Sequence, residues 1–202
     1  MCLNRDMSRS LDYLTGDPAA DALLASDPNA LLLGMVLDQQ VTMEKAFAGP
    51  AVLAERLGGT LDVARIAAMD PAEFETLCAE RPAIHRFPGA MAKRLQAVCV
   101  ELVENHQGSA ANLWQAADSG ADLFRAIKSL PGFGDQKAKI FVALLAKQYG
   151  VRPTGWKEAA GDYGLDGFRS VADVVDPESL AKVRVTKREA KAAAKKAKQD
   201  AG

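Results

Sequence analysis

A glycine-containing connection between two amphipathic segments is the part of this sequence best suited to binding a ligand. Residues 130–134 read Leu-Pro-Gly-Phe-Gly. The proline ends the preceding helix, while Gly132 and Gly134 can adopt positive φ and let another backbone approach closely. Backbone amides at the start of the following helix then face outward, where the helix dipole favours an anion. This pattern predicts a phosphate-binding site, to which Lys137 or Lys139 adds positive charge.

The two segments that flank this connection have the apolar spacing of helices. Residues 122–129 and 136–148 place their leucine, isoleucine and phenylalanine side chains on one helical face. We therefore predict a helix-hairpin-helix over residues 122–149. A tight corner between two helices with no ligand has the same local pattern, so the rest of the chain must decide between the two interpretations.

The elements that position the hairpin are also predicted to be helices. Proline suits the first position of a helix, and an aspartate before it can accept hydrogen bonds from the first-turn amides. Four Asp-Pro pairs precede apolar segments, at residues 17–18, 27–28, 70–71 and 176–177. Thr42, Thr60 and Ser109 offer the same capping chemistry. Runs of alternating β-branched residues are short, so we predict an all-α fold.

The C-terminal third of the chain contains a glycine-rich segment and then a lysine-rich one. Four glycines fall within residues 151–169, which we expect to be irregular. A last helix is predicted from about Pro177 to Lys198. Residues 182–202 carry eight Lys/Arg against two acidic residues, whereas residues 1–181 have a net charge of −7. We predict one helical domain over 1–181 and a basic tail over 182–202, which either adds salt-dependent affinity for phosphates or is a solvated helix.

Three segments, in the order found in a known family, resemble the HhH-GPD superfamily of DNA glycosylases, close to its endonuclease III and adenine glycosylase branch. Residues 130–138, LPGFGDQKA, look like the helix-hairpin-helix of that family. Residues 27–42 resemble its early helix and the glutamine-bearing turn that follows, and residues 91–108 resemble its middle helix. The resemblance implies two helical lobes with a DNA-binding cleft, and double-stranded DNA as the partner.

The resemblance also assigns residues to DNA. An enzyme that acts on a base within a duplex must extrude it, so it needs a phosphate clamp, a side chain that fills the vacated stack, and a pocket. Gln40 is then the side chain that fills the gap. The residues expected to contact DNA are Gln39, Gln40, Gly132, Phe133, Gly134, Gln136, Lys137 and Lys139. Without the other matches, the two glutamines would be an ordinary polar pair at a helix C-terminus.

The sequence departs from the family at its catalytic positions. Family members usually have an aspartate in the segment after the second hairpin helix, which here falls near residues 154–156, Thr-Gly-Trp. Members that also cleave the strand have a lysine in the hairpin helix, because a Schiff base requires an amine. Gln136 occupies that position, and Lys137 projects about 100° around the helix from it.

Other carboxylates are therefore the catalytic candidates. Glu158 and Asp162 lie in the glycine-rich segment with Trp156 and Tyr163, whose rings can stack on a base. We predict these carboxylates as catalytic residues and the two aromatic residues as pocket residues. Asp38, beside the glutamine pair, is a further acidic pocket residue. The alternatives are a loop whose aromatic side chains pack on the core and an ordinary aspartate at a helix end.

No cofactor or metal is predicted. Many relatives hold an iron-sulfur cluster with four thiolates near the C-terminus. This chain has three cysteines, none of them after Cys99, and its two histidines have no paired ligand spacing. The cysteines are expected to be reduced thiols in the core.

Composition limits the cellular setting. Hydrophobic residues make up 49% of the 202 residues, and the longest strongly apolar stretch, residues 30–37, is too short to cross a bilayer. The N-terminus lacks the pattern of a signal segment. We expect a globular, cytoplasmic, monomeric protein without a membrane partner.

Three functions are consistent with these observations. The first is base excision by a metal-free DNA glycosylase with displaced catalytic residues. The second is non-catalytic DNA binding or damage recognition by a protein that kept the clamp and lost the acid. The third is a helical protein-interaction module, which the acidic charge of residues 1–181 favours.

Overall fold

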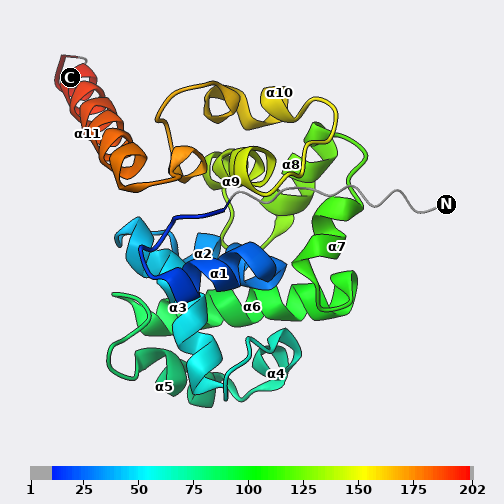
Figure 1. Ribbon diagram of the computed structural model, residues 1–202. Coiled ribbons are helices and arrows are strands. Elements are labelled where there is room, and N and C mark those ends of the chain that lie inside the picture. The colour runs from blue at the N-terminus through cyan, green and yellow to red at the C-terminus, as the bar shows by residue number, and fades with distance from the viewer. Residues whose placement is uncertain (1–10, 201–202) are drawn as a thin grey trace.

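The computed structural model describes the backbone of residues 11–200 and the side chains of residues 11–193. Figure 1 shows two helical lobes, one above the other. The lower lobe contains α1 (Pro18–Ser26), α2 (Pro28–Leu37), α3 (Met43–Arg56), α4 (Val63–Ala68), α5 (Pro71–Ala79) and α6 (Pro88–His106). The upper lobe contains α8 (Gly120–Ser129), α9 (Asp135–Gln148), α10 (Trp156–Ala160) and the short 3-10 helices η1 (Gly161–Gly164) and η2 (Val171–Asp173).

Two further helices complete the fold. α7 (Ala110–Gln115) connects the lobes, and α11 (Pro177–Asp200) follows the upper lobe. The described residues contain no strand, only an isolated bridge between Ser119 and Thr154. The predicted all-α fold with two lobes is therefore confirmed. α2 lies at the centre, where residues 30–37 are all buried, which explains why this stretch is apolar on every side.

Capping explains where the helices of the lower lobe begin. The side chains of Asp17, Asp27 and Asp70 accept hydrogen bonds from first-turn amides of α1, α2 and α5, as predicted from the Asp-Pro pairs. The expected cap of α4 was wrong by two residues. Asp62 caps the helix, because the Thr60 carbonyl oxygen accepts from the Asp62 amide in a turn that precedes it.

The segment predicted to be irregular, residues 151–169, contains α10 and η1. Gly155 and Gly161 flank α10 with φ of 78° and 57°, a conformation that favours glycine. A Cβ at Gly120 of α8 would clash with the Gly155 carbonyl group. The glycines therefore mark the two ends of α10 and allow it to pack closely on α8, which composition alone did not predict.

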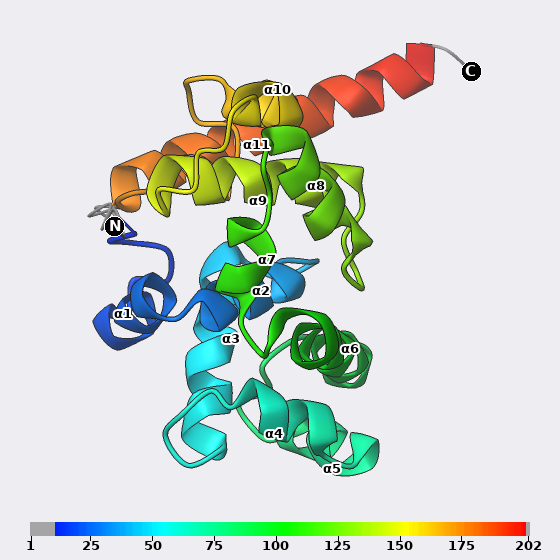
Figure 2. The same cartoon turned by 90° about the vertical axis from the view of Figure 1, so that its right-hand side faces the viewer.

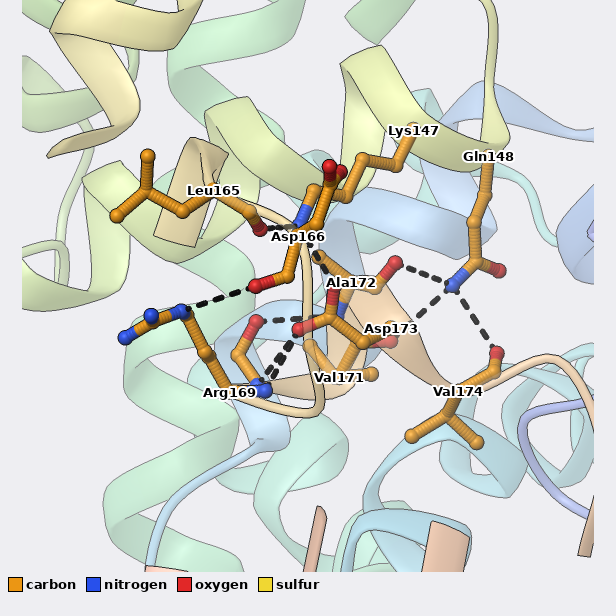
Figure 3. Close-up of polar contacts among 10 residues, drawn as sticks. Lys147, Gln148, Leu165, Asp166, Arg169, Val171, Ala172, Asp173 and Val174 are labelled. Carbon is orange, nitrogen blue, oxygen red and sulfur yellow. Dashed lines mark hydrogen bonds and ion pairs between the residues drawn. The ribbon is translucent and has the colours of Figure 1, made fainter. Parts of the chain in front are cut away.

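The end of α9 fixes the chain that leads into α11 (Figure 3). Gln148 donates from Nε2 to three carbonyl oxygens of residues 171–174 at 3.2, 2.8 and 3.0 Å. Lys147 donates from Nζ to Asp173 Oδ1 at 2.6 Å. These contacts hold η2, and with it the start of α11, on the upper lobe.

The described residues were predicted to lack a membrane span and a metal site and to contain buried cysteines. No single helix among the described residues is long and apolar enough to span a membrane, although α1 and α2, taken together as a bent pair, pass the same test. No group of three or more His, Cys, Asp or Glu residues in the described chain is arranged to hold a metal ion. Cys78 and Cys99 are buried, as predicted, and burial raises the pKa of both thiols to about 12. Cys2 lies outside the described residues.

Candidate nucleic-acid interface

The connection between α8 and α9 has the backbone geometry of an anion site. Gly132 adopts φ 84°, which favours glycine. No side chain caps α9, so its first-turn amides are left open. Gly134 differs from the expectation of positive φ: its φ is −95°, and a Cβ there would meet nothing within 4 Å. Glycine at this position therefore relieves no strain and instead leaves open space in front of α9.

Two of the predicted DNA contacts turn inward. The side chain of Phe133 is unsuited to DNA contact, because it is only 7% exposed and packs against Phe141 with ring centroids 5.9 Å apart. Lys137 donates from Nζ to the carbonyl oxygen of Val36 at 2.9 Å, and the same Nζ lies 5.6 Å from the centroid of the Phe133 ring. Lys139 is half-buried and lines the cleft between the lobes. Lys139 therefore supplies positive charge to the cleft.

The turn after α2 presents Gln40. Its side chain is exposed and its φ is 55°, a conformation that costs a non-glycine residue about 1–2 kcal/mol. The side chain of Gln39 is engaged within the protein, where it accepts a hydrogen bond from Arg94. An exposed glutamine held in an unfavourable conformation is typical of a functional tip.

Two residues of the lower lobe hold this turn. His85 is 1% exposed, and its Nδ1 accepts from the Phe87 amide at 3.0 Å. Nε2 therefore carries the hydrogen and donates to the Gln39 carbonyl oxygen at 2.7 Å. Arg94 of α6 binds the Gln39 side chain and also packs beneath Gly132. Arg94 thereby joins the glutamine turn to the hairpin.

We expect His85→Phe to lower the free energy of unfolding by about 2 kcal/mol, because the phenyl ring leaves the Gln39 carbonyl and the Phe87 amide without partners. Denaturant unfolding measures the change. His106→Phe is the matched control, because His106 is only half-buried at the end of α6 and its ring pairs just with Glu101 among the described side chains, at 3.9 Å, so its loss should change stability by less than about 0.5 kcal/mol. Equal stability of His85→Phe and the wild type would show that His85 does not hold the turn.

A cleft of about 900 Å³ opens between the glutamine turn and α9, within the size range of small-molecule sites. Its walls come from the turn after α2, the first turns of α9, η1 and the middle of α11. The predicted site residues that line it are Asp38, Gln40, Gln136, Lys139, Asp162 and Tyr163. Two carboxylates therefore lie in the cleft between Gln40 and the hairpin helix.

Asp38 is the more buried of these two carboxylates. Burial raises the pKa of Asp38, and the ammonium groups of Lys187 and Lys137 offset part of the rise. Asp38 is also the C-cap of α2, where the helix dipole disfavours an anion. Burial lowers the pKa of Lys137 to about 8, against the opposing effect of Asp38. A carboxylate whose charge is opposed by both burial and the helix dipole is typical of a functional group.

The aromatic and acidic residues predicted near η1 separate into two groups. The Tyr163 hydroxyl accepts from Gln136 Nε2 at 2.8 Å, and Asp162 is exposed at the rim of the cleft. Trp156 instead lines a separate cavity of about 540 Å³, and exposed Glu158 lines neither space. Trp156 and Tyr163, both predicted as pocket residues, therefore line different spaces, on either side of the end of α10.

Sequence reasoning missed His85 and Arg94, and it did not place the lysines of α11 in the cleft. His85 and Gln39 are 46 residues apart, so no local pattern connects them. Arg94 offers a weak signal, since it is a charged residue beside the buried stripe of α6. The lysines of α11 lie in a predicted basic tail, because this part of the sequence has no apolar stripe that would indicate a packed helix.

The fold and the site together define a helix-hairpin-helix protein with a cleft between two helical lobes. The chain matches the family described as HhH-GPD superfamily base excision DNA repair protein over residues 33–200. The matched region contains the glutamine turn, the hairpin and α11, so this protein belongs to the HhH-GPD superfamily of base excision DNA repair proteins. No curated protein and no solved structure gives a significant match.

Proposed function

We propose that this protein binds damaged double-stranded DNA and excises a base by hydrolysis of its N-glycosidic bond. The observation that carries the proposal is the cleft between Gln40 and the hairpin helix, which is lined by the carboxylate of Asp38. Damaged duplex DNA presents phosphates, a base stack and a glycosidic bond. Each of these has a suitable partner around the cleft.

The hairpin is suited to hold the DNA backbone. Gly132 and Gly134 leave the first-turn amides of α9 uncovered, and these amides lie at the positive end of the helix dipole. A phosphate bound there would position the duplex without reading its sequence. Lys139, which lines the cleft, adds positive charge on the same helix.

Gln40 is placed to fill the space that an extruded base leaves. Its side chain is free at the tip of a turn whose backbone is held by His85. Phe87, 44% exposed in the segment that follows His85, is a second side chain that can stack on an unpaired base. The guanidinium of Arg86 lies 5.3 Å from the Phe87 ring and adds charge at the same edge.

Asp38 supplies the chemistry in this proposal. As the bond from C1′ to the base nitrogen breaks, positive charge develops on the sugar, and an ionised carboxylate stabilises it. Water then forms the new bond to C1′ and loses a proton to the Asp38 carboxylate, and this proton passes through solvent to the nitrogen of the leaving base, so that the carboxylate is ionised again. The raised pKa of Asp38 makes it a stronger base than an exposed aspartate. Asp162, at the rim, is the second candidate.

We expect Gln40→Gly to reduce the preference for abasic over intact duplex by about tenfold, because the side chain that fills the stack is lost. Stability should stay the same or rise, since glycine adopts φ 55° without strain. Fluorescence anisotropy with the two duplexes measures the preference. Gln107→Gly is the matched control, because Gln107 has the same φ of 55° at the C-cap of α6. If both variants or neither lose the preference, Gln40 does not have this role.

A non-catalytic damage-recognition protein is the second candidate. Two departures from the family favour it: residues 154–156 contain no carboxylate, and Gln136 stands at the position of the family's lysine. The deciding experiment is release of free base from duplexes that carry uracil, oxidised or alkylated bases. Release from any of them supports excision. Salt-dependent binding to abasic duplex without release from any lesion supports recognition alone.

A further inference from the structure

Helix α11 forms one wall of the cleft. Thr186, Lys187, Ala190 and Lys191 face the cleft, at the spacing of residues that share one face of a helix. Asp38 lies on the part of the lining contributed by the lower lobe. The cleft between the two lobes therefore has a third wall, which α11 provides.

Contacts with both lobes hold α11 in this place. Leu180 and Val183, in its first two turns, are only 6% and 2% exposed. The segment that leads into the helix is fixed by the end of α9 (Figure 3). Arg184 forms an ion pair with Glu44 of α3. The position of α11 beside the cleft is therefore set by packing and charge on both sides.

The helix loses its apolar packing after Val183. Residues 184–193 are mostly exposed, and Figure 2 shows α11 extending away from the body toward the side on which the connection between α8 and α9 lies. Among the side chains that the structure describes, neither Lys187 nor Lys191 forms an ion pair. Neither lysine is therefore neutralised by an ion pair among the described side chains, although Lys187 lies close enough to Asp38 to lower the pKa of that carboxyl group.

The cleft is positively charged on an otherwise acidic domain. Residues 1–181 have a net charge of −7. The charged residues that line the cleft are Lys139, Arg169, Lys187 and Lys191 against Asp38 and Asp162. A nucleotide that enters the cleft stays attached to a phosphate on each side, and these phosphates need positive charge at the cleft walls.

We propose that Lys187 and Lys191 bind the phosphates that flank the extruded nucleotide, so that α11 and the hairpin hold the damaged DNA from two sides of the cleft. The inference rests on the proposed function, because it needs a nucleotide in the cleft. It differs from non-specific attraction of a basic tail, since it assigns two residues to two phosphates. The alternative is that α11 blocks the cleft. In that case, replacing Lys187 and Lys191 by neutral residues would improve DNA binding.

The experiment uses the variant Lys187→Gln/Lys191→Gln and the control Lys182→Gln/Arg188→Gln, which removes the same charge from α11 at positions that do not line the cleft. The probe is a duplex with one tetrahydrofuran abasic analogue, in which methylphosphonates replace either the two flanking phosphates or two remote ones. We expect flanking methylphosphonates to weaken binding by the wild type and the control about tenfold, and binding by the cleft variant hardly at all. The salt slope of the cleft variant should fall by about 2.

Failure of the inference can be told apart from failure of the proposed function. Equal sensitivity of the two variants to the flanking methylphosphonates, or tighter binding by the cleft variant, overturns the role of Lys187 and Lys191. The proposed function then stands if the wild-type protein still releases base from a duplex that carries a lesion. A wild-type protein that binds none of the duplexes refutes both.

Discussion

Asp38→Asn is expected to lower the single-turnover rate of base release by about a thousandfold, since the amide can neither accept the proton of water nor stabilise the charged sugar. The same change should raise the free energy of unfolding at neutral pH by about 1 kcal/mol. Burial and the C-terminal end of α2 both oppose the charge of Asp38, and the amide removes that cost. Loss of activity with a gain in stability separates a catalytic role from a structural one.

The stability gain has a defined dependence on pH. The folded-state pKa of Asp38 lies above its ordinary value of 3.8. Between these two values the folded protein binds more protons than the unfolded chain, so the stability of the wild type falls as the pH rises through this window. Asparagine does not titrate. The advantage of Asp38→Asn should therefore grow across the window and disappear at lower pH, as thermal unfolding at several pH values will show.

Two other carboxylates serve as controls for this experiment. Glu158→Gln should release base at the wild-type rate, because Glu158 is exposed and lies outside the cleft. Asp162→Asn should slow release by less than about tenfold, since an exposed carboxylate at the rim is screened by water. If Asp162→Asn abolishes release and Asp38→Asn does not, Asp162 is the catalytic carboxylate and the assignment of Asp38 is wrong.

Gly134→Asp is expected to weaken binding to abasic duplex about a hundredfold. Aspartate is a favourable N-cap, so its carboxylate would take the first-turn amides of α9 and repel a phosphate from the same place. The fold should tolerate the change, because φ at Gly134 is −95° and a Cβ there meets nothing within 4 Å. Stability should rise by a few tenths of a kcal/mol.

Gly134→Ala separates the effect of the aspartate carboxylate on DNA binding from the effect of added bulk. Alanine adds bulk in front of α9 without a charge or a cap, so its effect on binding should be smaller, about tenfold. Gly132 is a poorer position for the test, since its φ of 84° would strain any other residue. Affinity of Gly134→Asp equal to that of the wild type would mean that DNA does not approach the hairpin.

The parts of the fold that could be predicted from sequence depend on local chemistry. The Asp-Pro pairs mark helix starts because the cap and the first turn are neighbours in the chain. The hairpin could be located because proline and glycine act on their own backbone. Gln136 and Lys137 point in different directions, as helix geometry requires, and the structure places Gln136 against Tyr163 and Lys137 against Val36.

The parts that could not be predicted depend on contacts between distant segments. The charge environment of Asp38 includes Lys187, far along the chain on α11. Trp156 and Tyr163 are close in sequence, yet the end of α10 sends them to different cavities. Composition identified the acidic domain and the basic C-terminal helix. It could not show that this helix forms a wall of the cleft.

The central claim is that the cleft receives an extruded nucleotide with Asp38 facing its sugar. The most direct measurement is a crystal structure of the protein bound to a duplex with a tetrahydrofuran abasic analogue. We predict that a phosphate lies on the amides at the start of α9, that Gln40 lies within the base stack, and that the Asp38 carboxylate lies near C1′ of the analogue. An analogue that stays in the duplex, with Asp38 and the hairpin away from DNA, would contradict the claim.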